Sequence, residues 1–242
     1  MTQVDDCSSD DSYSTVSSTV SRSTTINEER IYRVACLGTP GCGKSQLLFT
    51  YCSGFPLNWV KEIFDNYHKK VLINNSKNIH LEISETNSIE ELESIKGDNG
   101  LNHIDCFLIC FSITNRKSFE SCYSLWYQEL IKNNLANTKS STPIILIGTK
   151  NDLRNTINNK NENYYSNNES YIEDPCNDGK PYVSYDEGLE MSKKIGAAHF
   201  FEISSLLNKT GSIEDLFNKI AVVVYNKNKS KNKKKKSGCI IN

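Results

Sequence analysis

The sequence lacks the features of several large classes of protein. Its 9 cysteines include no C-x-x-C pair, and no histidine stands at ligand spacing from them, so a zinc site is not expected. No apolar run is long enough to span a bilayer, and no secretory leader is recognisable. We therefore expect a cytosolic protein whose cysteines are reduced thiols. A glycine is also missing at position 2, which argues against N-myristoylation.

A strong net charge of either sign is absent as well. The 242 residues carry a formal net charge of −1, so the composition does not indicate a nucleic-acid partner. The charge is unevenly placed, because acidic residues are scattered near the N-terminus and the last stretch is strongly basic. Residues 1–30 are rich in Ser, Thr and Asp and poor in large apolar side chains, so we expect this extension to be disordered.

The most informative stretch is a glycine-rich loop between a predicted strand and a predicted helix. An apolar run, Ile31–Leu37, leads into the pattern G-x-x-x-x-G-K-[ST]. Its glycines let backbone N–H groups turn toward a phosphate; Lys44 is expected to reach the β- and γ-phosphates, and Ser45 to ligate Mg²⁺. A turn that binds nothing is the alternative, but eight matching residues in this context favour a phosphate-binding loop. The residues are Gly38, Thr39, Pro40, Gly41, Cys42, Gly43, Lys44 and Ser45.

Short apolar strands alternate with amphipathic helices from Tyr32 onward, which is typical of an α/β domain with a mainly parallel sheet. Continuous apolar runs predict strands buried on both faces at Cys106–Phe111 and Ile144–Ile147. Further short strands are predicted at Leu81–Ile83 and near His199–Glu202, and a helix is predicted to end at Ile195. Two apolar stripes at helical spacing predict core-facing helices. They are Phe119, Cys122, Tyr123, Trp126 and Leu130, and Ile213, Leu216, Phe217, Ile220 and Val224.

A second polar loop, Thr149–Asp152, follows directly after one of these buried strands. A carboxylate held at a strand end can accept hydrogen bonds from N1–H and the exocyclic amine of guanine, two donors that adenine lacks, so Asp152 can select the base. The stem of Lys150 can lie along the base plane. Three later residues, Ser204, Ser205 and Leu206, follow another predicted strand and can offer a backbone N–H to the guanine oxygen.

With these motifs in place, the chain resembles the Rho/Rac family of small GTPases within the Ras superfamily. The family-specific matches are Phe64–Tyr67, Phe107–Ser112, Trp126-Tyr127, an inserted segment after Asp152 and a basic tail that ends in a C-a-a-X box. The resemblance implies a P-loop NTPase fold with a doubly wound, mostly parallel six-stranded sheet. It implies a monomer that binds GTP or GDP with Mg²⁺ and signals to actin-organising effectors, with exchange factors and a prenyl-binding dissociation inhibitor as further partners. It also implies that Phe55 packs against the base and that Glu62, Ile63, Phe64, Asp65, Asn66 and Tyr67 form the effector region.

The chain departs from the family in the first switch. Glu62 stands where the family places a threonine whose hydroxyl completes the Mg²⁺ shell. A carboxylate is a competent ligand for a hard cation. It also brings a negative charge toward the triphosphate, and like charges about 4 Å apart repel by on the order of 4 kcal/mol at an effective dielectric constant of about 20. The alternative is that Glu62 points to solvent and leaves the switch undocked.

The chain departs further from the family in the motif that begins at Glu85. Where the family has D-T-A-G-Q-E, this chain has Glu85-Thr86-Asn87-Ser88-Ile89-Glu90. Glu85 can still hold Mg²⁺ through water. Ser88 replaces a glycine that contacts the γ-phosphate, and Ile89 replaces the glutamine that orients the attacking water, a role for which an aliphatic side chain has no polar atom. Pro40 replaces a glycine of the phosphate loop and narrows the entry of an arginine finger. We therefore expect defective hydrolysis and assign no catalytic residue.

The remaining segments flank or interrupt the predicted domain, residues 31–226. An Asn-rich stretch at about 155–180 is expected to be an expanded insert. Residues 227–242 form a polybasic tail whose Cys239 is the predicted prenylation site. A lipid and a lysine run together give stable membrane binding, so we expect anchorage to anionic inner-leaflet lipid on the cytoplasmic face of the plasma membrane or endomembranes, with a cytosolic fraction.

Three hypotheses follow. The first is a membrane-anchored, Rho-like GTP-binding protein with little or no GTPase activity, which acts by binding effectors. The second is a slow but genuine GTPase switch whose Mg²⁺ ligation runs through Glu62 and Glu85. The third is a pseudo-GTPase scaffold that binds no nucleotide.

Overall fold

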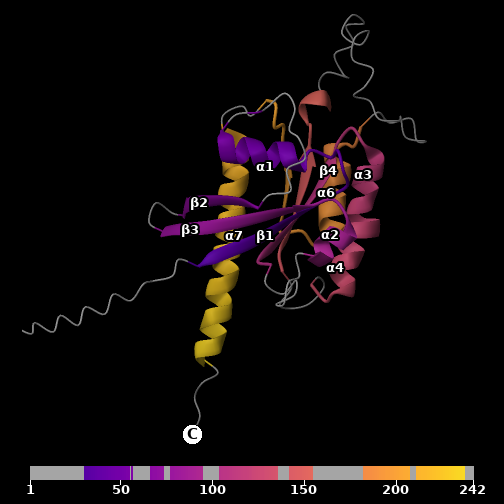
Figure 1. The fold of residues 1–242 in the computed structure, drawn as a ribbon. Helices are drawn as coiled ribbons and strands as arrows, with labels where there is room; N and C mark the ends of the chain where they lie inside the picture. The colour runs from indigo at the N-terminus through magenta and orange to yellow at the C-terminus, as the bar shows by residue number, and fades with distance from the viewer. Residues whose placement is uncertain are drawn as a thin grey trace, which may run out of the picture.

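The computed structural model describes residues 30–54, 56, 66–73, 77–94, 104–135, 142–154, 182–207 and 211–237. Its centre is a six-stranded sheet with the order β2-β3-β1-β4-β5-β6 (Figure 1). The strands are β1 (Ile31–Leu37), β2 (Tyr67–Ile73), β3 (Lys77–Thr86), β4 (Cys106–Ser112), β5 (Ile144–Thr149) and β6 (His199–Glu202). The helices are α1 (Lys44–Ser53), α2 (Ile89–Ser94), α3 (Arg116–Ser121), the π-helical η2 (Cys122–Tyr127), α4 (Gln128–Lys132), α6 (Tyr185–Lys194) and α7 (Ser212–Ser237).

All strand pairs of the sheet are parallel except β2–β3. This confirms the predicted α/β fold with a mostly parallel sheet. Because parallel strands present their carboxyl ends at one edge, the loops that follow β1, β3, β4, β5 and β6 meet there. That edge carries the predicted nucleotide-binding loops.

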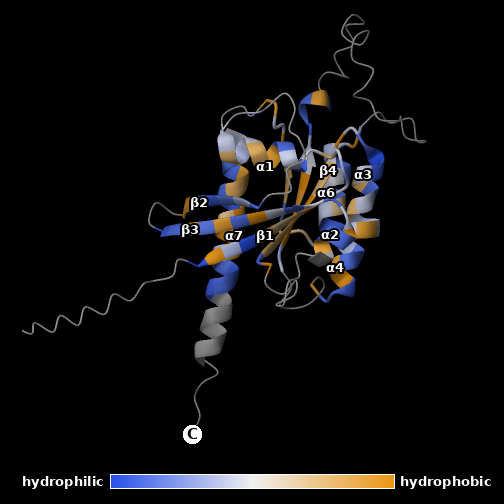
Figure 2. Ribbon diagram, in the orientation of Figure 1, coloured by the Kyte–Doolittle hydropathy of each residue, from blue (hydrophilic) through white to orange (hydrophobic). Residues whose placement is uncertain are grey.

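Two apolar layers, one on each face, bury the sheet. Helices α1 and α7 cover one face, where the rings of Tyr51 and Phe217 stack with their centroids 3.7 Å apart. On the other face, residues from α2, α3, η2, α4 and the end of α6 pack around Phe107 and Phe111. Figure 2 shows the corresponding apolar colour along the strands between these helices. Both predicted stripes contribute to these layers: all five α7 positions are fully buried, and Tyr123 alone of the first stripe is only partly buried.

The edge of the sheet differs from the prediction. The three residues Leu81–Ile83 lie inside a ten-residue strand, β3, and the antiparallel strand β2 was not predicted. Burial alternates along β2, with Val71 and Ile73 in the core and His68, Lys70 and Leu72 exposed. The hydropathy of the sequence hides this alternation, because the charged Lys69 occupies a half-buried inward position and the apolar Leu72 an exposed one.

Several predictions lie outside the described residues. They are the N-terminal extension 1–29, Phe55, Glu62, Ile63, Phe64, Asp65, the insert at 155–180 and Cys239. Helix α7 continues through residue 227, where the basic tail was predicted to begin, and ends at Ser237. Among the described helices, none has the length and apolarity needed to cross a membrane.

Candidate functional site

The glycine-rich loop joins β1 to the start of α1, as predicted. Gly43 is the N-cap residue of α1, and no side chain caps the helix or places an acid in its first turn. The first backbone N–H groups of a helix have no partner within the helix, and the helix dipole adds positive potential there. The start of α1 is therefore suited to bind an anion such as a phosphate.

Lys44 is held in place by the loop itself. Only 2% of the residue is exposed. Its Nζ donates to the Gly38 carbonyl at 2.7 Å and to the Thr39 carbonyl at 3.1 Å, and it lies 3.8 Å from the Cys42 Sγ. These bonds hold the ammonium against the loop. Its positive charge adds to the positive potential at the start of α1.

Glu85 meets this site from the neighbouring strand. It lies near the end of β3 and pairs in register with Cys36 of β1. Ser45 Oγ donates to Glu85 Oε1 at 2.8 Å, and the same oxygen lies 4.0 Å from Lys44 Nζ. Two oxygen donors of the kind that Mg²⁺ prefers, a hydroxyl and a carboxylate, therefore lie side by side.

Two glycines of the loop are required by close contacts. A Cβ on Gly38 would lie 2.5 Å from the Cys110 carbonyl oxygen and 2.9 Å from Cys42 Sγ. Gly43 has φ +100°, and a Cβ there would lie 3.2 Å from Thr149 Oγ1. The loop can pass over β4 and approach β5 this closely only because both residues lack a side chain.

Pro40 and Gly41 form the exposed tip of the loop. The Cys42 N–H donates to the Thr39 carbonyl at 3.3 Å, which closes a four-residue turn. Gly41, at the third position of this turn, has φ +75°, and proline occupies the second. This is the residue order of a type II turn. Pro40 therefore fits the shape of the loop, in addition to removing an N–H from it.

Cys42 is a neutral thiol in this setting. Burial raises the pKa of this thiol to about 11, and the nearby Lys44 ammonium only partly opposes that rise. Since the thiolate is the nucleophilic form of cysteine, Cys42 serves here as a small packing residue under the loop.

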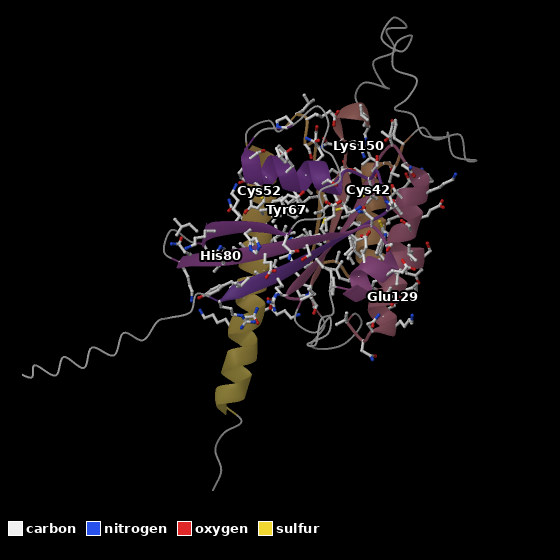
Figure 3. The ribbon with its side chains drawn as sticks, in the orientation of Figure 1. Cys42, Cys52, Tyr67, His80, Glu129 and Lys150 are labelled. Carbon is white, nitrogen blue, oxygen red and sulfur yellow. The ribbon has the colours of Figure 1, made fainter. Side chains whose placement is uncertain are left out.

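The loop after β5 contacts the phosphate loop directly. The Thr149 hydroxyl lies within hydrogen-bond distance of the Cys42 carbonyl, and 3.1 Å from the Phe111 carbonyl. Lys150 has φ +60°, and its Nζ donates to the Gly41 carbonyl at 2.9 Å. Figure 3 shows Lys150 and Cys42 at the same end of the sheet. Side chains of the loop predicted to bind the base are thus hydrogen-bonded to backbone carbonyls of the loop predicted to bind phosphate.

The third predicted loop lies beside the second. The Asn151 N–H donates to the Ile203 carbonyl at 3.2 Å, and the Ile203 N–H donates to the Gly148 carbonyl at 2.8 Å. Ser204 and Ser205 are buried, whereas Leu206 is 55% exposed. Ser204 Oγ accepts the Leu207 N–H at 2.9 Å, which stabilises the turn. Asp152 is half-buried at the start of a short helical turn next to this loop.

The segment after β3 begins a helix. Ser88 Oγ accepts the Glu91 N–H at 3.2 Å, and Glu91 Oε2 accepts the Asn87 N–H at 2.5 Å. Ser88 thus caps the start of the helix, while Glu91 bonds the N–H of the residue before Ser88. Ile89, the next residue, is half-buried and packs against the apolar layer under α2. The position predicted to lack a water-orienting group thus carries a side chain that contacts the core.

Two residues of the predicted effector region are described: Asn66, which directly precedes β2, and Tyr67, its first residue. Ser84 Oγ donates to Asn66 Oδ1 at 2.7 Å, and Asn66 Nδ2 donates to Glu82 Oε1 at 3.4 Å. Tyr67 is half-buried against the layer formed with α1 and α7. Both residues are therefore anchored to β3 at the edge of the sheet.

The sequence analysis missed an ion pair that adjoins two of these loops. Arg154 follows Asp152 by two positions, and its guanidinium makes hydrogen bonds with both carboxylate oxygens of Glu202, at 2.5 and 2.6 Å. The partners are 48 positions apart in the chain. No local pattern predicts such a pair; the available signal is the position of Arg154 two residues after Asp152.

Comparison with known proteins gives consistent matches over this whole region. The Ras family model matches residues 33–226. The chain is 36% identical to the Rho-related protein racN of Dictyostelium discoideum over 203 residues, which cover 84% of this chain and 80% of that protein. It is 32% identical to the GTP-binding protein RHO3 of Saccharomyces cerevisiae (82% and 87% covered) and 29% identical to the human Rho-related GTP-binding protein RhoE (85% and 76% covered).

Proposed function

Because the chain belongs to the Rho family of small GTPases, within the Ras superfamily, we propose that it binds guanine nucleotide at this site and hydrolyses GTP slowly or not at all. In this proposal it signals through the proteins that recognise its GTP-bound form. The observation that carries the proposal is the contrast within the site. The loops for phosphate and base are hydrogen-bonded to one another, whereas the segment after β3 forms the capped start of helix α2.

The phosphate side is supported by the start of α1 and by Lys44. The backbone N–H groups of residues 43–45 offer donors to a phosphate, and the buried ammonium of Lys44 supplies the positive charge. On the base side, Asp152 accepts the two guanine donors, Lys150 lines the base, and Ser204–Leu206 contribute a backbone N–H. Mutation of Lys44 or Asp152 to alanine should weaken GDP binding by more than about tenfold.

The residues near Ser45 fit a magnesium ion. Ser45 Oγ and Glu85 Oε1, 2.8 Å apart, would hold it directly or through water. The ion supplies neutralisation of the charge on the β- and γ-phosphates. Glu85 has one methylene more than the aspartate usual in the family, so its carboxylate reaches Ser45 directly. This contact favours the rewired switch as the second candidate function.

The hydrolysis defect is supported by Ser88 and Ile89. Ser88 accepts a hydrogen bond from Glu91, and this cap fixes residues 87–91 at the start of α2. Ile89 has no polar atom with which to orient a water molecule, and its side chain packs against the core. Replacement of Ile89 by glutamine alone should therefore restore little activity, because the helix cap still holds the backbone.

The test is single-turnover GTP hydrolysis by the purified protein, with and without a Rho-type activating protein. We expect a rate far below that of an ordinary Rho protein measured alongside. Ile89→Gln should recover little, and the combination Pro40→Gly, Glu62→Thr, Ser88→Gly and Ile89→Gln should recover far more. A wild-type rate equal to that of the ordinary protein would overturn the proposal and favour the rewired switch. Absence of any affinity for GDP and GTP would favour the nucleotide-free scaffold.

We also propose that Cys239 is prenylated and that the lysine run beside it strengthens membrane binding, which would bring the domain to actin-organising effectors. A terminal C-a-a-X box with upstream lysines supports this proposal. Cys239→Ser should move the protein to the soluble fraction. Neutralising Lys233–Lys236 should weaken membrane binding and leave lipid attachment intact. Unchanged membrane localisation of Cys239→Ser would exclude this anchor.

A further inference from the structure

Arg154 contacts two other segments of the chain. Its Nη1 and Nη2 donate to Glu202 at 2.5 and 2.6 Å, and its Nη2 also donates to the Val183 carbonyl at 2.8 Å. Its guanidinium lies over the ring of Tyr182, 5.7 Å from the centroid. One side chain therefore ties together the end of the base-selecting loop, the end of β6 and the first described residues after the insert.

The pair is well shielded from water. The side chain of Arg154 is 19% exposed and that of Glu202 is 8% exposed. The hydrogen bonds with Glu202 raise the pKa of the arginine above its already high ordinary value, although burial opposes this rise. Charged, two-pronged hydrogen bonds in such surroundings are strong and directional, and removal of one partner leaves the other charge buried.

The position of each partner links the pair to base recognition. Arg154 follows Asp152 within the same short helical turn, and Glu202 directly precedes Ile203 and the loop Ser204–Leu206. Glu202 also packs close to Gly148, because a Cβ on that glycine would lie 3.3 Å from Glu202 Cγ. The ion pair thus spans the two loops that have to meet neighbouring groups on one edge of guanine, the N1–H and exocyclic amine for Asp152 and the oxygen for Ser204–Leu206.

We propose that Arg154 is a positioning residue for guanine recognition, which holds Asp152 in register with the loop Ser204–Leu206. The inference rests on the proposed nucleotide binding and deepens it. It assigns a role in base selection and exchange to a residue that touches no nucleotide in this scheme.

Arg116 provides a matched control. It makes a similar ion pair with Glu187, with Nη1 2.6 Å from Oε1, and its Nη2 donates to the Tyr182 carbonyl at 3.5 Å. Its side chain is 10% exposed, so it is buried at least as deeply as Arg154. Its ion pair joins α3 to α6, however, and not the two loops predicted to bind the base. Arg116→Met should therefore reproduce the loss of stability without the effect on base selection.

The experiment compares wild type, Arg154→Met and Arg116→Met by dissociation of a fluorescent GDP and by the ratio of affinities for GDP and IDP. IDP lacks the exocyclic amine, so this ratio reports how well Asp152 is placed. For Arg154→Met we expect dissociation faster by about tenfold or more and a smaller preference for GDP. For Arg116→Met we expect a lower melting temperature with both quantities unchanged.

The outcomes separate this inference from the proposed function. A wild-type protein with no affinity for GDP would defeat the proposed function itself. A wild type that binds GDP, together with an Arg154→Met variant of unchanged dissociation rate and base preference, would overturn only the inference. If Arg154→Met does not fold, Arg154→Lys and Glu202→Gln, which keep most of the packing, decide by the same two readouts. An equal effect of Arg116→Met on base preference would also overturn the inference.

Discussion

The phosphate loop illustrates how a single unusual residue can fit its place. From the sequence, Pro40 stood out as the loss of one backbone N–H from a loop that uses such groups. In the structure, Pro40 and Gly41 occupy the two central positions of a closed turn, with Gly41 at φ +75°. Proline fixes its own φ near the value that this turn requires, so the tip of the loop is ordered before any ligand binds.

A single substitution at Gly38 gives a testable prediction for the same loop. Gly38→Ala would place a Cβ 2.5 Å from the Cys110 carbonyl oxygen, and overpacking of this kind costs about 1–3 kcal/mol. The clash also pushes on Cys42, so affinity for GDP should fall together with the free energy of unfolding. Urea unfolding and GDP titration check this.

Gly54→Ala is the control. Gly54 ends α1 with φ +81°, and a Cβ there meets nothing within 4 Å. It should cost stability of about 1 kcal/mol through its backbone conformation alone. Its affinity for GDP should stay that of wild type. Equal loss of GDP affinity in both variants would contradict the argument.

Most elements could be predicted from the sequence, and the exceptions have physical causes. The strands Cys106–Ser112 and Ile144–Thr149 are buried on both faces and therefore read as plain apolar runs. Strand β2 lies at the sheet edge, and its first four residues lack the buried positions that a pattern needs. The Asn74-Asn75-Ser76 sequence before β3 is typical of a turn and was the available indication of a hairpin.

Some parts of the candidate site could also be predicted from the sequence and others could not. The phosphate and base loops could be predicted because short motifs encode them, and the structure brings those loops together. The Arg154–Glu202 pair could not, since it depends on how two distant segments pack. The helix cap at Ser88 was also missed, although the pattern of Ser88 followed three positions later by Glu91 is that of a capping box.

The cap of α2 can be tested by removing one hydroxyl. Ser88→Ala should lower the free energy of unfolding by about 1 kcal/mol, and Ser88→Gly by only a few tenths of that amount, since glycine is tolerated at this position. Urea unfolding measures both. Ser124→Ala, whose hydroxyl bonds the Glu120 carbonyl within a helix, should be nearly neutral. Equal values for Ser88→Ala and Ser124→Ala would show that the cap contributes nothing.

Helix α6 carries a pH dependence. Burial alone would raise the pKa of Glu187, but hydrogen bonds from Arg116 and Ser184 outweigh it and lower the pKa to about 2. Because the folded-state pKa is depressed, the stabilisation is complete above the ordinary value of 4.5 and is lost as the pH falls from there toward 2. Glu187→Gln should therefore be less stable than wild type at pH 7, and the difference should shrink between pH 5 and about 3.

The measurement is urea unfolding of both proteins across that pH range. Glu120→Gln, which removes an exposed carboxylate on the same side of the sheet, serves as the control and should track wild type throughout. A difference between wild type and Glu187→Gln that is the same at every pH would count against the assignment.

At the scale of the whole molecule, a polar network of Arg30, Arg33, Asp105 and Asn228 joins the start of the described chain to helix α7. Asn228 of α7 donates to Asp105 Oδ1 at 2.9 Å and accepts from Arg30 Nη2 at 2.8 Å. The Arg33 N–H donates to the other Asp105 oxygen at 3.1 Å. The start of β1, the residue before β4 and the late part of α7 are thereby held together, at the end of the sheet opposite the nucleotide site.

Removing one member of this polar network should lower the free energy of unfolding of the whole domain. Asn228 is only 4% exposed, so Asn228→Ala removes one partner from the largely buried Asp105 carboxylate and one from the half-exposed Arg30. We expect a loss of about 1–3 kcal/mol in the free energy of unfolding, measured with urea. Lys229→Ala, at the exposed neighbouring position, should change it by less than about 0.5 kcal/mol. Similar values for the two variants would sink the argument.

Helix α7 also bears on the distance between the domain and the membrane. Beyond Asn228 it continues to Ser237, and Figure 1 shows it projecting below the sheet. Nine residues of helix span about 14 Å at 1.5 Å each. With the lipid two residues further on at Cys239 and the lysines 233–236 at the membrane surface, as proposed, the part of the helix before them is a spacer that limits how closely the domain approaches the bilayer. A partner would then have to reach the nucleotide end of the domain from the far side of that gap, which restricts it to proteins that extend well into the cytosol.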